Sequence, residues 1–440
     1  MAQRSPFIRT SHVWDSSRVT IPKLTPSSDN TATDRGDRAT VQALGVVEPV
    51  GRHRQLAVTG GILLAAGVTL SAANLRPAVT SLASVLGDVR TGLGVSASWT
   101  SLLTAVPVLC FGAAAFAAPW VGRRFGLKRA VASALALLTF GLLLRVVDGP
   151  FVVLGGTFIA CAGIAVCNVL IPVVVKDSFP TRIGLITGVY TAAMAAGAGL
   201  GAALTPPLEA LLGSWRLAVG AWALLSAAAL VLWLAGARKG VTGRVARTPA
   251  GRSLLRSPLA WVMTVFFGLQ ALLAYTVMGW LPAILGDAGV DRTTAGFLLA
   301  ITVVLGVPVS LVVPPLAARW SSQVGMVLVL GVFSLSGVLG LAFAPGFSPA
   351  LWVLLVGLGM GGMFPLALVM VSLRTVSTSD TARLSAMTQS IGYLLAATGP
   401  FAFGLVREAT GAWTVSMIVL AGLVVLLTGL GAVAGRNRFV

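Results

Sequence analysis

Long apolar segments recur along this chain from about residue 56 to its end. A helix needs about 20 apolar residues to span the hydrocarbon core of a bilayer. Of the 440 residues, 56% are hydrophobic and 10% are charged, whereas a soluble domain carries about 25% charged residues. Because a water-soluble fold has no place for so much apolar surface, lipid must be the solvent for most of the chain. The sequence therefore predicts an all-α membrane protein.

Twelve apolar segments qualify as membrane-spanning helices. We expect them at 56–86, 98–119, 128–147, 151–174, 184–206, 215–236, 258–285, 294–316, 324–343, 348–372, 383–406 and 412–434. The first and seventh are long enough to tilt or bend within the bilayer.

Lys and Arg are distributed unevenly between the two sides that twelve spans define. Of the 31 basic residues, 25 fall in the amino-terminal tail, the carboxyl end and the loops of one side. Five fall in loops of the other side: Arg90, Arg145, Arg216, Arg292 and Arg407. Cytoplasmic loops carry the excess of basic residues in membrane proteins. We therefore expect a multi-pass protein of the cell (inner) membrane with both termini in the cytoplasm.

The loops divide the chain into five predicted segments. A polar stretch, 1–55, lacks apolar periodicity and is expected to be a disordered cytoplasmic tail. Two six-helix bundles follow, 56–236 and 258–434, joined by a basic, Gly-rich cytoplasmic linker at 237–257. Residues 435–440 form a second cytoplasmic tail.

The two halves also resemble each other in sequence. GVSASWTSLL at 94–103 resembles GVDRTTAGFL at 289–298, and each opens the second helix of its half. TRIGLITGVY at 181–190 resembles TARLSAMTQS at 381–390, and each opens a fifth helix. These separations of 195 to 200 residues predict two pseudo-symmetric six-helix units. Such repeats are typical of transporters that rock around a central site.

Several classes of function lack the residues that they need. The two histidines, His12 and His53, precede the first span, and the three cysteines lie inside apolar runs. We find no nucleophile–base pair, metal cluster or nucleotide motif, so we expect neither an enzyme nor a metal or other cofactor. The basic charge lies in short loops, which argues for membrane topology rather than nucleic-acid binding. We expect a monomer whose partners are the lipid bilayer and a small-molecule substrate.

Four stretches resemble a known family. They are Asn74-Leu75-Arg76-Pro77, GIAVCNVLIPVVVKDSFPTRIGLITGVYT at 163–191, GLGMGGMFPLAL at 357–368 and QSIGYLLAATGP at 389–400. The arrangement resembles the major facilitator superfamily, and these stretches are similar to its cyanate permease and 2-nitroimidazole transporter family (CynX/NimT). The resemblance implies the major facilitator fold, with twelve transmembrane helices in two pseudo-symmetric bundles.

One loop departs from the superfamily pattern. After the second helix the superfamily usually carries an Asp-Arg pair before Gly and basic residues. This chain keeps Gly126 and the basic residues, but Arg123 and Arg124 stand at that pair. We assign Arg123, Arg124 and Gly126 to a gating or loop role that lacks the usual acid. Lys176, in a matching stretch, is placed in the same group, with an anchor at the inner helix end as the alternative.

Arg76 is the most informative single residue. It lies within the first predicted span and is followed by Pro77, which interrupts helical hydrogen bonding. A cation there costs at least ~2.5 kcal/mol on insertion scales. No carboxylate is predicted at the middle of the membrane to neutralise it. We therefore expect Arg76 to bind an anionic or polar substrate with support from Asn74; the alternative is that Arg76 extends to the outer interface.

Further polar residues within the spans are candidates for the same site. They are Asn168, Tyr190, Gln270, Tyr275, Gln389 and Tyr393. Gln389 and Tyr393 are four residues apart and share a helix face. The alternative for each is ordinary hydrogen bonding between helices. Gly197 and Gly201 form a small-xxx-small pair, for which close helix packing is expected.

These features predict a secondary active transporter of a small polar or anionic solute, such as cyanate, that works by alternating access. An exporter of drugs or nitroimidazole-like compounds is one alternative. A membrane sensor or scaffold that binds a ligand without moving it is another, from a different class of function.

Overall fold

The computed structural model describes residues 61–240 and 254–440. The predicted tail at 1–55, and residues 241–253 of the predicted linker, lie outside the described residues. The described residues form seventeen α-helices and a short 3-10 helix, η1 (Leu254–Arg256). The α-helices are α1 (Ile62–Ala73), α2 (Pro77–Ser84), α3 (Leu86–Leu93), α4 (Ala97–Ala115), α5 (Ala118–Phe125), α6 (Leu127–Leu144), α7 (Pro150–Ser178), α8 (Ile183–Leu212), α9 (Trp215–Gly220), α10 (Trp222–Gly240), α11 (Pro258–Asp287), α12 (Arg292–Val304), α13 (Gly306–Arg319), α14 (Val324–Phe343), α15 (Pro349–Leu373), α16 (Thr378–Thr410) and α17 (Trp413–Ala434).

Twelve helical segments of the described ranges are long and apolar enough to cross a membrane, which confirms the predicted number. Three of them consist of two helices in succession: α1 with α2, α9 with α10, and α12 with α13. The described part of the first span begins at Ile62, and residues 56–60 of the prediction lie outside the described residues. Among the described residues, the ends differ most from the prediction in α8 and α16. Helix α8 ends at Leu212 rather than 206, and α16 begins at Thr378 rather than 383.

The early start of α16 has a local cause. The backbone N–H of Asp380 donates to the Ser377 hydroxyl, which in turn donates to the Asp380 carboxylate. This cap satisfies one of the amide groups that a helix start leaves without partners. The turn that it stabilises is polar, so apolar content alone did not reveal it.

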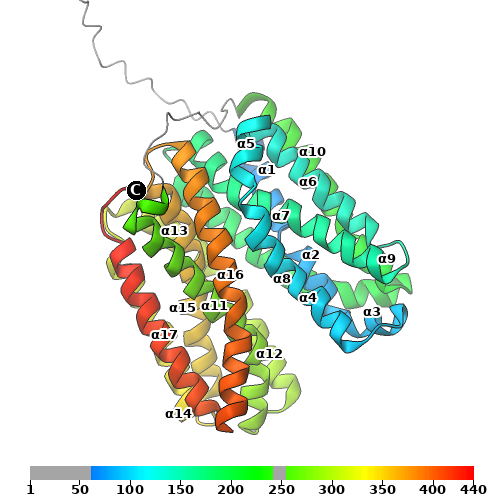
Figure 1. Cartoon of the computed structure of the whole chain (residues 1–440), viewed down its shortest axis with the longest axis vertical. Helices are drawn as coiled ribbons and strands as arrows, with labels where there is room; N and C mark the ends of the chain where they lie inside the picture. The colour runs from blue at the N-terminus through cyan, green and yellow to red at the C-terminus, as the bar shows by residue number, and fades with distance from the viewer. Residues whose placement is uncertain (1–60, 241–253) are drawn as a thin grey trace, which may run out of the picture. The chain divides into compact units, whose positions relative to one another are not determined.

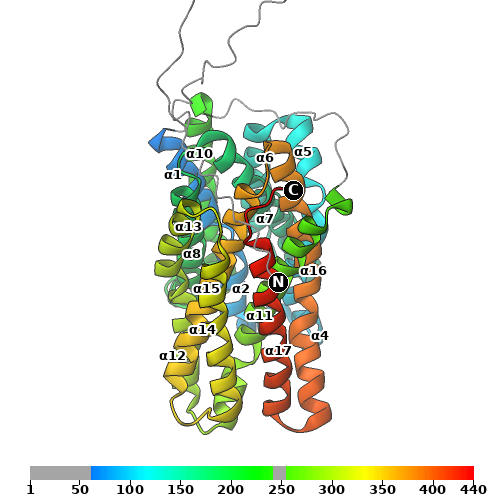
Figure 2. The same cartoon turned by 90° about the vertical axis from the view of Figure 1, so that its left-hand side faces the viewer.

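The helices form two bundles within residues 61–440 (Figure 1). Helices α1–α10 make one bundle and helices α11–α17 make the other (Figure 1). The long helices of both bundles run close to parallel (Figure 2), which suits a protein that crosses a membrane twelve times. Across the boundary α8 packs against α13, and α16 packs against α4 and α7.

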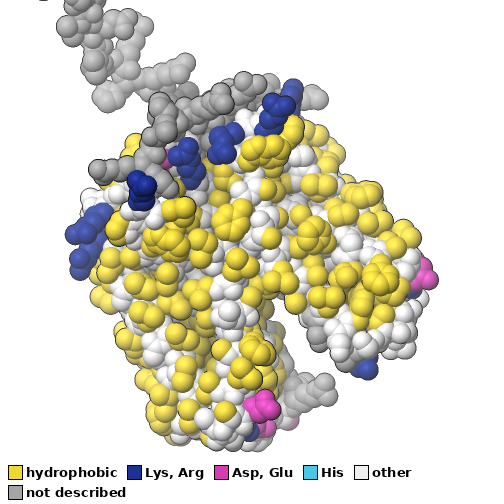
Figure 3. Space-filling view, viewed as in Figure 1, with side chains coloured by type: hydrophobic (Ala, Val, Ile, Leu, Met, Phe, Trp, Pro, Cys, Tyr) yellow, Lys and Arg dark blue, Asp and Glu magenta, His cyan; other side chains and the backbone are white. Residues whose placement is uncertain are grey.

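Basic side chains gather at one end of the two bundles, which we call the basic end (Figure 3). It carries the exposed residues Arg123 and Arg124 at the end of α5, Arg319 at the end of α13, and Arg436 after α17. These residues belong to the side on which the sequence places the excess of Lys and Arg.

The bundles meet closely toward the basic end and are apart at the opposite end. Gly184 and Gly188 of α8 lie against α13: a Cβ on Gly184 would come within 2.6 Å of the Pro314 carbonyl oxygen, and one on Gly188 within 2.7 Å of the Ser310 carbonyl oxygen. Only glycine lets two helix backbones approach this far. At the other end a hollow separates the bundles (Figure 3).

Candidate functional site

The first membrane-spanning segment is interrupted between α1 and α2. Pro77 occupies the first position of α2, and a proline has no N–H with which to continue the hydrogen bonding of α1. The N–H groups of Asn74 and Leu75 therefore bond to carbonyls three residues back, as in a 3-10 turn. Arg76 follows as the cap of α2. The break places Arg76 at the amino-terminal end of a helix, where the helix dipole is positive.

Glycines of α8 hold this break in place. A Cβ on Gly197 would overlap the carbonyl oxygen of Ala73, and one on Gly201 would come within 2.8 Å of the Pro77 Cα. The close helix packing predicted for these glycines is confirmed. Its consequence is that the interrupted segment lies directly against α8.

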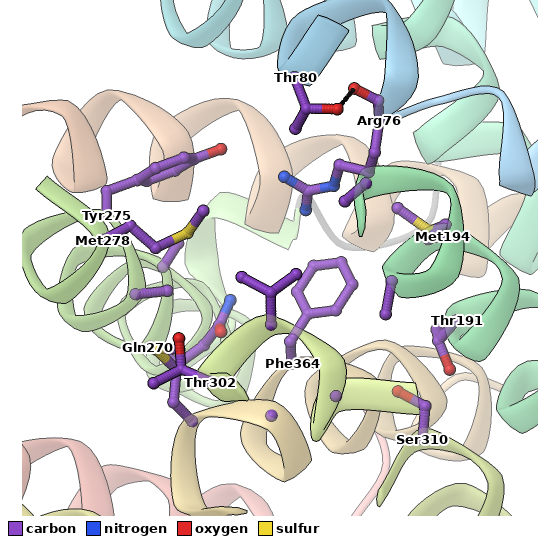
Figure 4. A pocket seen from close by; sticks show the side chains of 18 of the residues that line it. Arg76, Thr80, Thr191, Met194, Gln270, Tyr275, Met278, Thr302, Ser310 and Phe364 are labelled. Carbon is purple, nitrogen blue, oxygen red and sulfur yellow. Dashed lines mark hydrogen bonds between the residues drawn. The ribbon is translucent and has the colours of Figure 1, made fainter. Parts of the chain in front are cut away.

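A cavity of about 160 Å³ lies between the two bundles beside the break (Figure 4). One bundle contributes residues of α8 together with Arg76 and Thr80. The other contributes residues of α11, α12, α13, α15 and α16. The lining consists of Arg76, Thr80, Thr191, Met194, Ala195, Ala198, Gln270, Ala271, Ala274, Tyr275, Met278, Thr302, Val303, Gly306, Ser310, Met360, Gly361, Phe364 and Tyr393.

The Arg76 guanidinium points into this cavity (Figure 4). Its central carbon lies 5.4 Å from the centre of the Phe364 ring, a cation–π contact. Tyr275 and Tyr393 line the same cavity and interact electrostatically with the guanidinium. The backbone carbonyl of Arg76 accepts hydrogen bonds from the N–H and the hydroxyl of Thr80. The backbone of Arg76 is thus held by hydrogen bonds from α2, and its side chain contacts aromatic residues of the opposite bundle.

Among residues 61–240 and 254–440, no carboxylate forms an ion pair with Arg76. The groups that interact with the guanidinium are tyrosines and one phenylalanine ring. A charged side chain within a membrane span normally pairs with another charged group or with backbone carbonyls. The site can therefore attract a small anion from solution without first breaking an ion pair.

Four of the residues singled out from the sequence line the cavity: Arg76, Gln270, Tyr275 and Tyr393. Gln270 and Tyr393 are each 2% exposed. The side-chain nitrogen of Gln270 is buried and has no hydrogen-bond partner within the described parts of the chain. Such a donor is suited to an acceptor atom on a bound solute.

The other four candidates do not line the cavity. The Asn74 amide donates to the carbonyls of Leu70 (2.7 Å) and Leu225 (3.3 Å) inside the amino-terminal bundle. The Gln389 amide donates to the backbone carbonyl of Asn168 at 3.0 Å and so connects α16 with α7. Tyr190 is buried in α8. Asn168 and Gln389 therefore meet at the boundary of the two bundles.

The sequence did not single out most of the apolar wall. Met194, Met278, Met360 and Phe364 lie around the polar groups. Phe364 follows a glycine cluster, and a Cβ on Gly361 would come within 3.2 Å of the Gly306 Cα. This cluster was a usable signal, because glycines that bring α15 onto α13 also bring Phe364 to the cavity.

The residues assigned to a gate or loop lie toward the basic end. Arg123 and Arg124 are exposed at the end of α5, and Gly126 has a φ of +78°, which glycine adopts readily. Lys176 lies near the end of α7 and donates to the backbone carbonyl of Ser372 at 2.9 Å. Lys176 therefore contacts the opposite bundle.

Arg145 corrects one expectation. The sequence places it among the loop residues, but its side chain is 0% exposed. The chain turns directly after α6, and the guanidinium enters the amino-terminal bundle, where it donates to the carbonyl of Ala78 at 2.6 Å. The expectation was wrong because a position directly after an apolar segment is also where an exposed loop arginine would lie.

Comparison with known proteins agrees with this architecture. Residues 61–400 match the family model described as Major Facilitator Superfamily. The 2-nitroimidazole transporter of Escherichia coli (strain K12) is 35% identical over 379 residues, covering 86% of this chain and 96% of that protein. The cyanate transport protein CynX of the same organism is 31% identical over 358 residues, covering 80% and 93%.

A solved structure shows the same fold. The proton:xylose symporter XylE bound to 6-bromo-6-deoxy-D-glucose aligns with a TM-score of 0.69 over 83% of this chain and 94% of that one. At 12% identity this likeness concerns the fold alone. Together with the family match and the identity to the two transporters, it shows that the chain belongs to the major facilitator superfamily of secondary transporters.

Proposed function

We propose that this transporter carries a small anionic or strongly polar solute, with Arg76 as its main electrostatic contact. The observation that carries the proposal is a guanidinium that faces a cavity between two bundles and lacks a carboxylate partner among the described residues. A cation at membrane depth is costly, by at least ~2.5 kcal/mol on insertion scales. An anion that binds beside Arg76 would offset that cost and complete the pair.

The other polar groups suggest how such a solute is held. A guanidinium presents a planar set of N–H donors that matches two acceptor atoms at once. The hydroxyls of Tyr275 and Tyr393 lie beside it, and the Gln270 amide offers a further donor. Cyanate, which the name of one relative mentions, is a small anion with an acceptor at each end. A cyanate-like solute suits this set of donors.

A second candidate is favoured by the apolar part of the cavity. Its volume of about 160 Å³ is close to that of a cavity of about 150 Å³ that binds benzene. Phe364 and the methionines would pack against a flat ring, while an acceptor group faced Arg76. A nitroimidazole-like compound has this combination, and the name of the other relative mentions one. Both candidate solutes need Arg76, but only the nitroimidazole-like compound needs the apolar wall formed by Phe364 and the methionines.

The packing of the bundles supports a direction for the alternating access. They are close at the basic end and apart at the other, with the cavity between them. If the positive-inside rule holds here, the basic end is cytoplasmic. The conformation would then be open to the outside of the cell membrane. Rocking of the bundles would close the outer hollow and expose the same cavity to the cytoplasm.

Transport by reconstituted protein tests the proposal. Purified wild type, Arg76→Ala, Arg76→Lys and the control Arg90→Ala are placed in proteoliposomes, and the flux of labelled cyanate and of 2-nitroimidazole is measured with and without a pH gradient. Arg90 is an exposed arginine of α3. We expect wild-type flux from Arg90→Ala, partial flux from Arg76→Lys and flux at the background level from Arg76→Ala. Lysine is only partly effective because a point charge does not reproduce the planar fork.

Two outcomes would contradict the proposal. Wild-type flux from folded Arg76→Ala would remove Arg76 from the site. Binding of a probe by thermal shift without any flux would favour a membrane sensor.

A further inference from the structure

Arg145 is a fully buried arginine that does not line the proposed transport site. It follows α6, and its side chain is 0% exposed. Its Nε donates to the Thr157 hydroxyl of α7 at 3.1 Å, and its Nη1 donates to the Ala78 carbonyl of α2 at 2.6 Å. Gly156 leaves room for it, because a Cβ there would lie 3.3 Å from the Arg145 Cγ. Three helices thus meet at one guanidinium.

The charge of Arg145 is not neutralised by an acid within the described residues. The titratable group that interacts with it is the Cys161 thiol, and no ion pair involves it. Its Nη2 has no hydrogen-bond partner in the described ranges. Burial accordingly lowers the pKa of the guanidinium. Burying a cation with two neutral acceptors is unfavourable, so a purely structural contact would be better served by an uncharged side chain.

The helix that Arg145 holds is the one that begins next to Arg76. Ala78 lies in the first turn of α2, two residues after Arg76. That turn is joined to Arg76 because the N–H groups of Val79 and Thr80 both donate to the Arg76 carbonyl. A shift of α2 would therefore move the Arg76 backbone and change the direction of its guanidinium.

The same helix is supported on another side by α8. Gly201 lies against Pro77 and Thr80, so α2 can approach α8 closely. Because glycine has no side chain, Gly201 makes no side-chain hydrogen bond that would orient α2. The hydrogen bond from Arg145 is directional, whereas the glycine contact limits only distance. Together they determine both the distance and the rotation of α2.

We propose that Arg145 is a positioning residue that holds α2 through the Ala78 carbonyl and thereby aims Arg76 at the substrate. The proposal rests on the proposed function of Arg76, because it assigns Arg145 a part in the same site. Arg145 does not line the cavity. Its role in binding is exerted through Arg76.

Hydrogen exchange of the purified full-length protein tests the structural half of the proposal without any ligand. The amides of residues 79–84 are compared in wild type, Arg145→Met, Arg145→Lys and the control Arg216→Met. Arg216 pairs with Asp148 and has no hydrogen bond to α2. We expect exchange in α2 to be roughly tenfold faster in Arg145→Met, because a hydrogen bond from a charged donor is lost. Arg145→Lys should restore part of the protection, and Arg216→Met should resemble wild type.

A double-mutant cycle tests whether Arg145 acts through Arg76. The dissociation constant of cyanate, or of 2-nitroimidazole if that is the probe that binds, is measured for Arg145→Met in the wild-type and Arg76→Lys backgrounds. We expect a loss of roughly tenfold in the first and less than about twofold in the second, since coupled residues are not additive. Equal losses in both backgrounds, or unchanged exchange of α2, would overturn the proposal.

Two further outcomes keep the two proposals separate. If wild type binds neither probe, the proposed substrate class fails, while the exchange of α2 still decides whether Arg145 holds that helix. If Arg145→Met does not fold, Thr157→Val removes the acceptor of the Arg145 Nε and leaves the charge in place. Faster exchange of α2 in Thr157→Val would then support the proposal, and unchanged exchange would oppose it.

Discussion

Lys176 and Thr375 belong to opposite bundles, and the Lys176 Nζ donates a hydrogen bond to the Thr375 hydroxyl at 2.9 Å. The same ammonium also donates to the backbone carbonyls of Ser372 and Thr375. Ser372 lies in the last turn of α15, where carbonyls have no partner within the helix and the dipole is negative. One lysine therefore connects the two bundles toward the basic end.

Removal of this contact should favour the conformation that is open at the basic end. Hydrogen bonds from charged groups contribute roughly 1.5–3 kcal/mol, so Lys176→Met should shift the ratio of the two conformations by about tenfold or more. Double electron–electron resonance between spin labels at Arg182→Cys and Arg319→Cys, which flank the contact of α8 with α13, would report a longer distance. The labels are placed in a background without the native cysteines.

Lys128→Met is the matched control, because Lys128 is also near the basic end but has no hydrogen bond to the other bundle. An unchanged distance distribution in Lys176→Met would show that glycine packing alone closes this end.

Gly197→Ala should damage the site through packing. The added Cβ would overlap the Ala73 carbonyl oxygen at the helix break, and overpacking of this kind costs about 1–3 kcal/mol. We expect a lower melting temperature and reduced transport. Gly199→Ala is the control on the same helix, since a Cβ there meets nothing within 4 Å. It should be neutral or stabilising, because alanine favours a helix by up to ~1 kcal/mol over glycine. Equal melting temperatures for the two variants would refute the packing argument.

Tyr393→Phe should weaken substrate binding without loss of fold. It removes the hydroxyl beside Arg76 but keeps the ring that packs 5.3 Å from Phe267 and 5.4 Å from Phe111, centre to centre. A neutral hydrogen bond contributes about 0.5–1.5 kcal/mol, so the dissociation constant should rise roughly threefold to tenfold. Isothermal titration with the probe that binds measures it. Tyr190→Phe is the control, because Tyr190 is equally buried but lies outside the cavity lining. Its dissociation constant should stay within about twofold of the wild-type value. A loss of affinity comparable to that of Tyr393→Phe would contradict the assignment of Tyr393 to the site.

Asn74→Ala should lower stability and spare binding. The Asn74 amide joins Leu70 of α1 to Leu225 of α10, and the loss of such bonds costs about 1 kcal/mol. Thermal unfolding of the purified variant should show a lower midpoint, whereas the shift produced by a bound probe should equal that of wild type. A smaller probe-induced shift would instead return Asn74 to the binding site.

Sequence reasoning identified Arg76 because its signal is local. A cation inside an apolar run, followed by proline, is unusual wherever it occurs, and neither the cost of the charge nor the missing N–H depends on distant residues. Gln389 and Tyr393 show the limit of such reasoning. Their spacing places them on one face of α16, yet Gln389 bonds to α7 while Tyr393, one turn further on, lines the cavity. The spacing of two residues on one helix face does not reveal at which turn that face stops packing against the opposite bundle and begins to line the cavity.

Arg145 shows the same limit for charge. Its place in the chain, directly after an apolar segment, is also that of an interfacial loop arginine. Its burial depends on Ala78, 67 residues earlier, and on Thr157 in the next helix. No local pattern contains that contact.

The sequence alone determined that lipid is the solvent of the chain and how many spans it has. Both depend on the free energy of transferring about 20 consecutive residues into lipid, and that sum is made over neighbours in the chain. Tertiary structure decided which polar side chains share the cavity, which cation lies buried at the meeting of three helices, and which lysine joins the bundles. Those outcomes depend on the rotation of each helix and on its partner across the boundary, and small residues far apart in sequence set both.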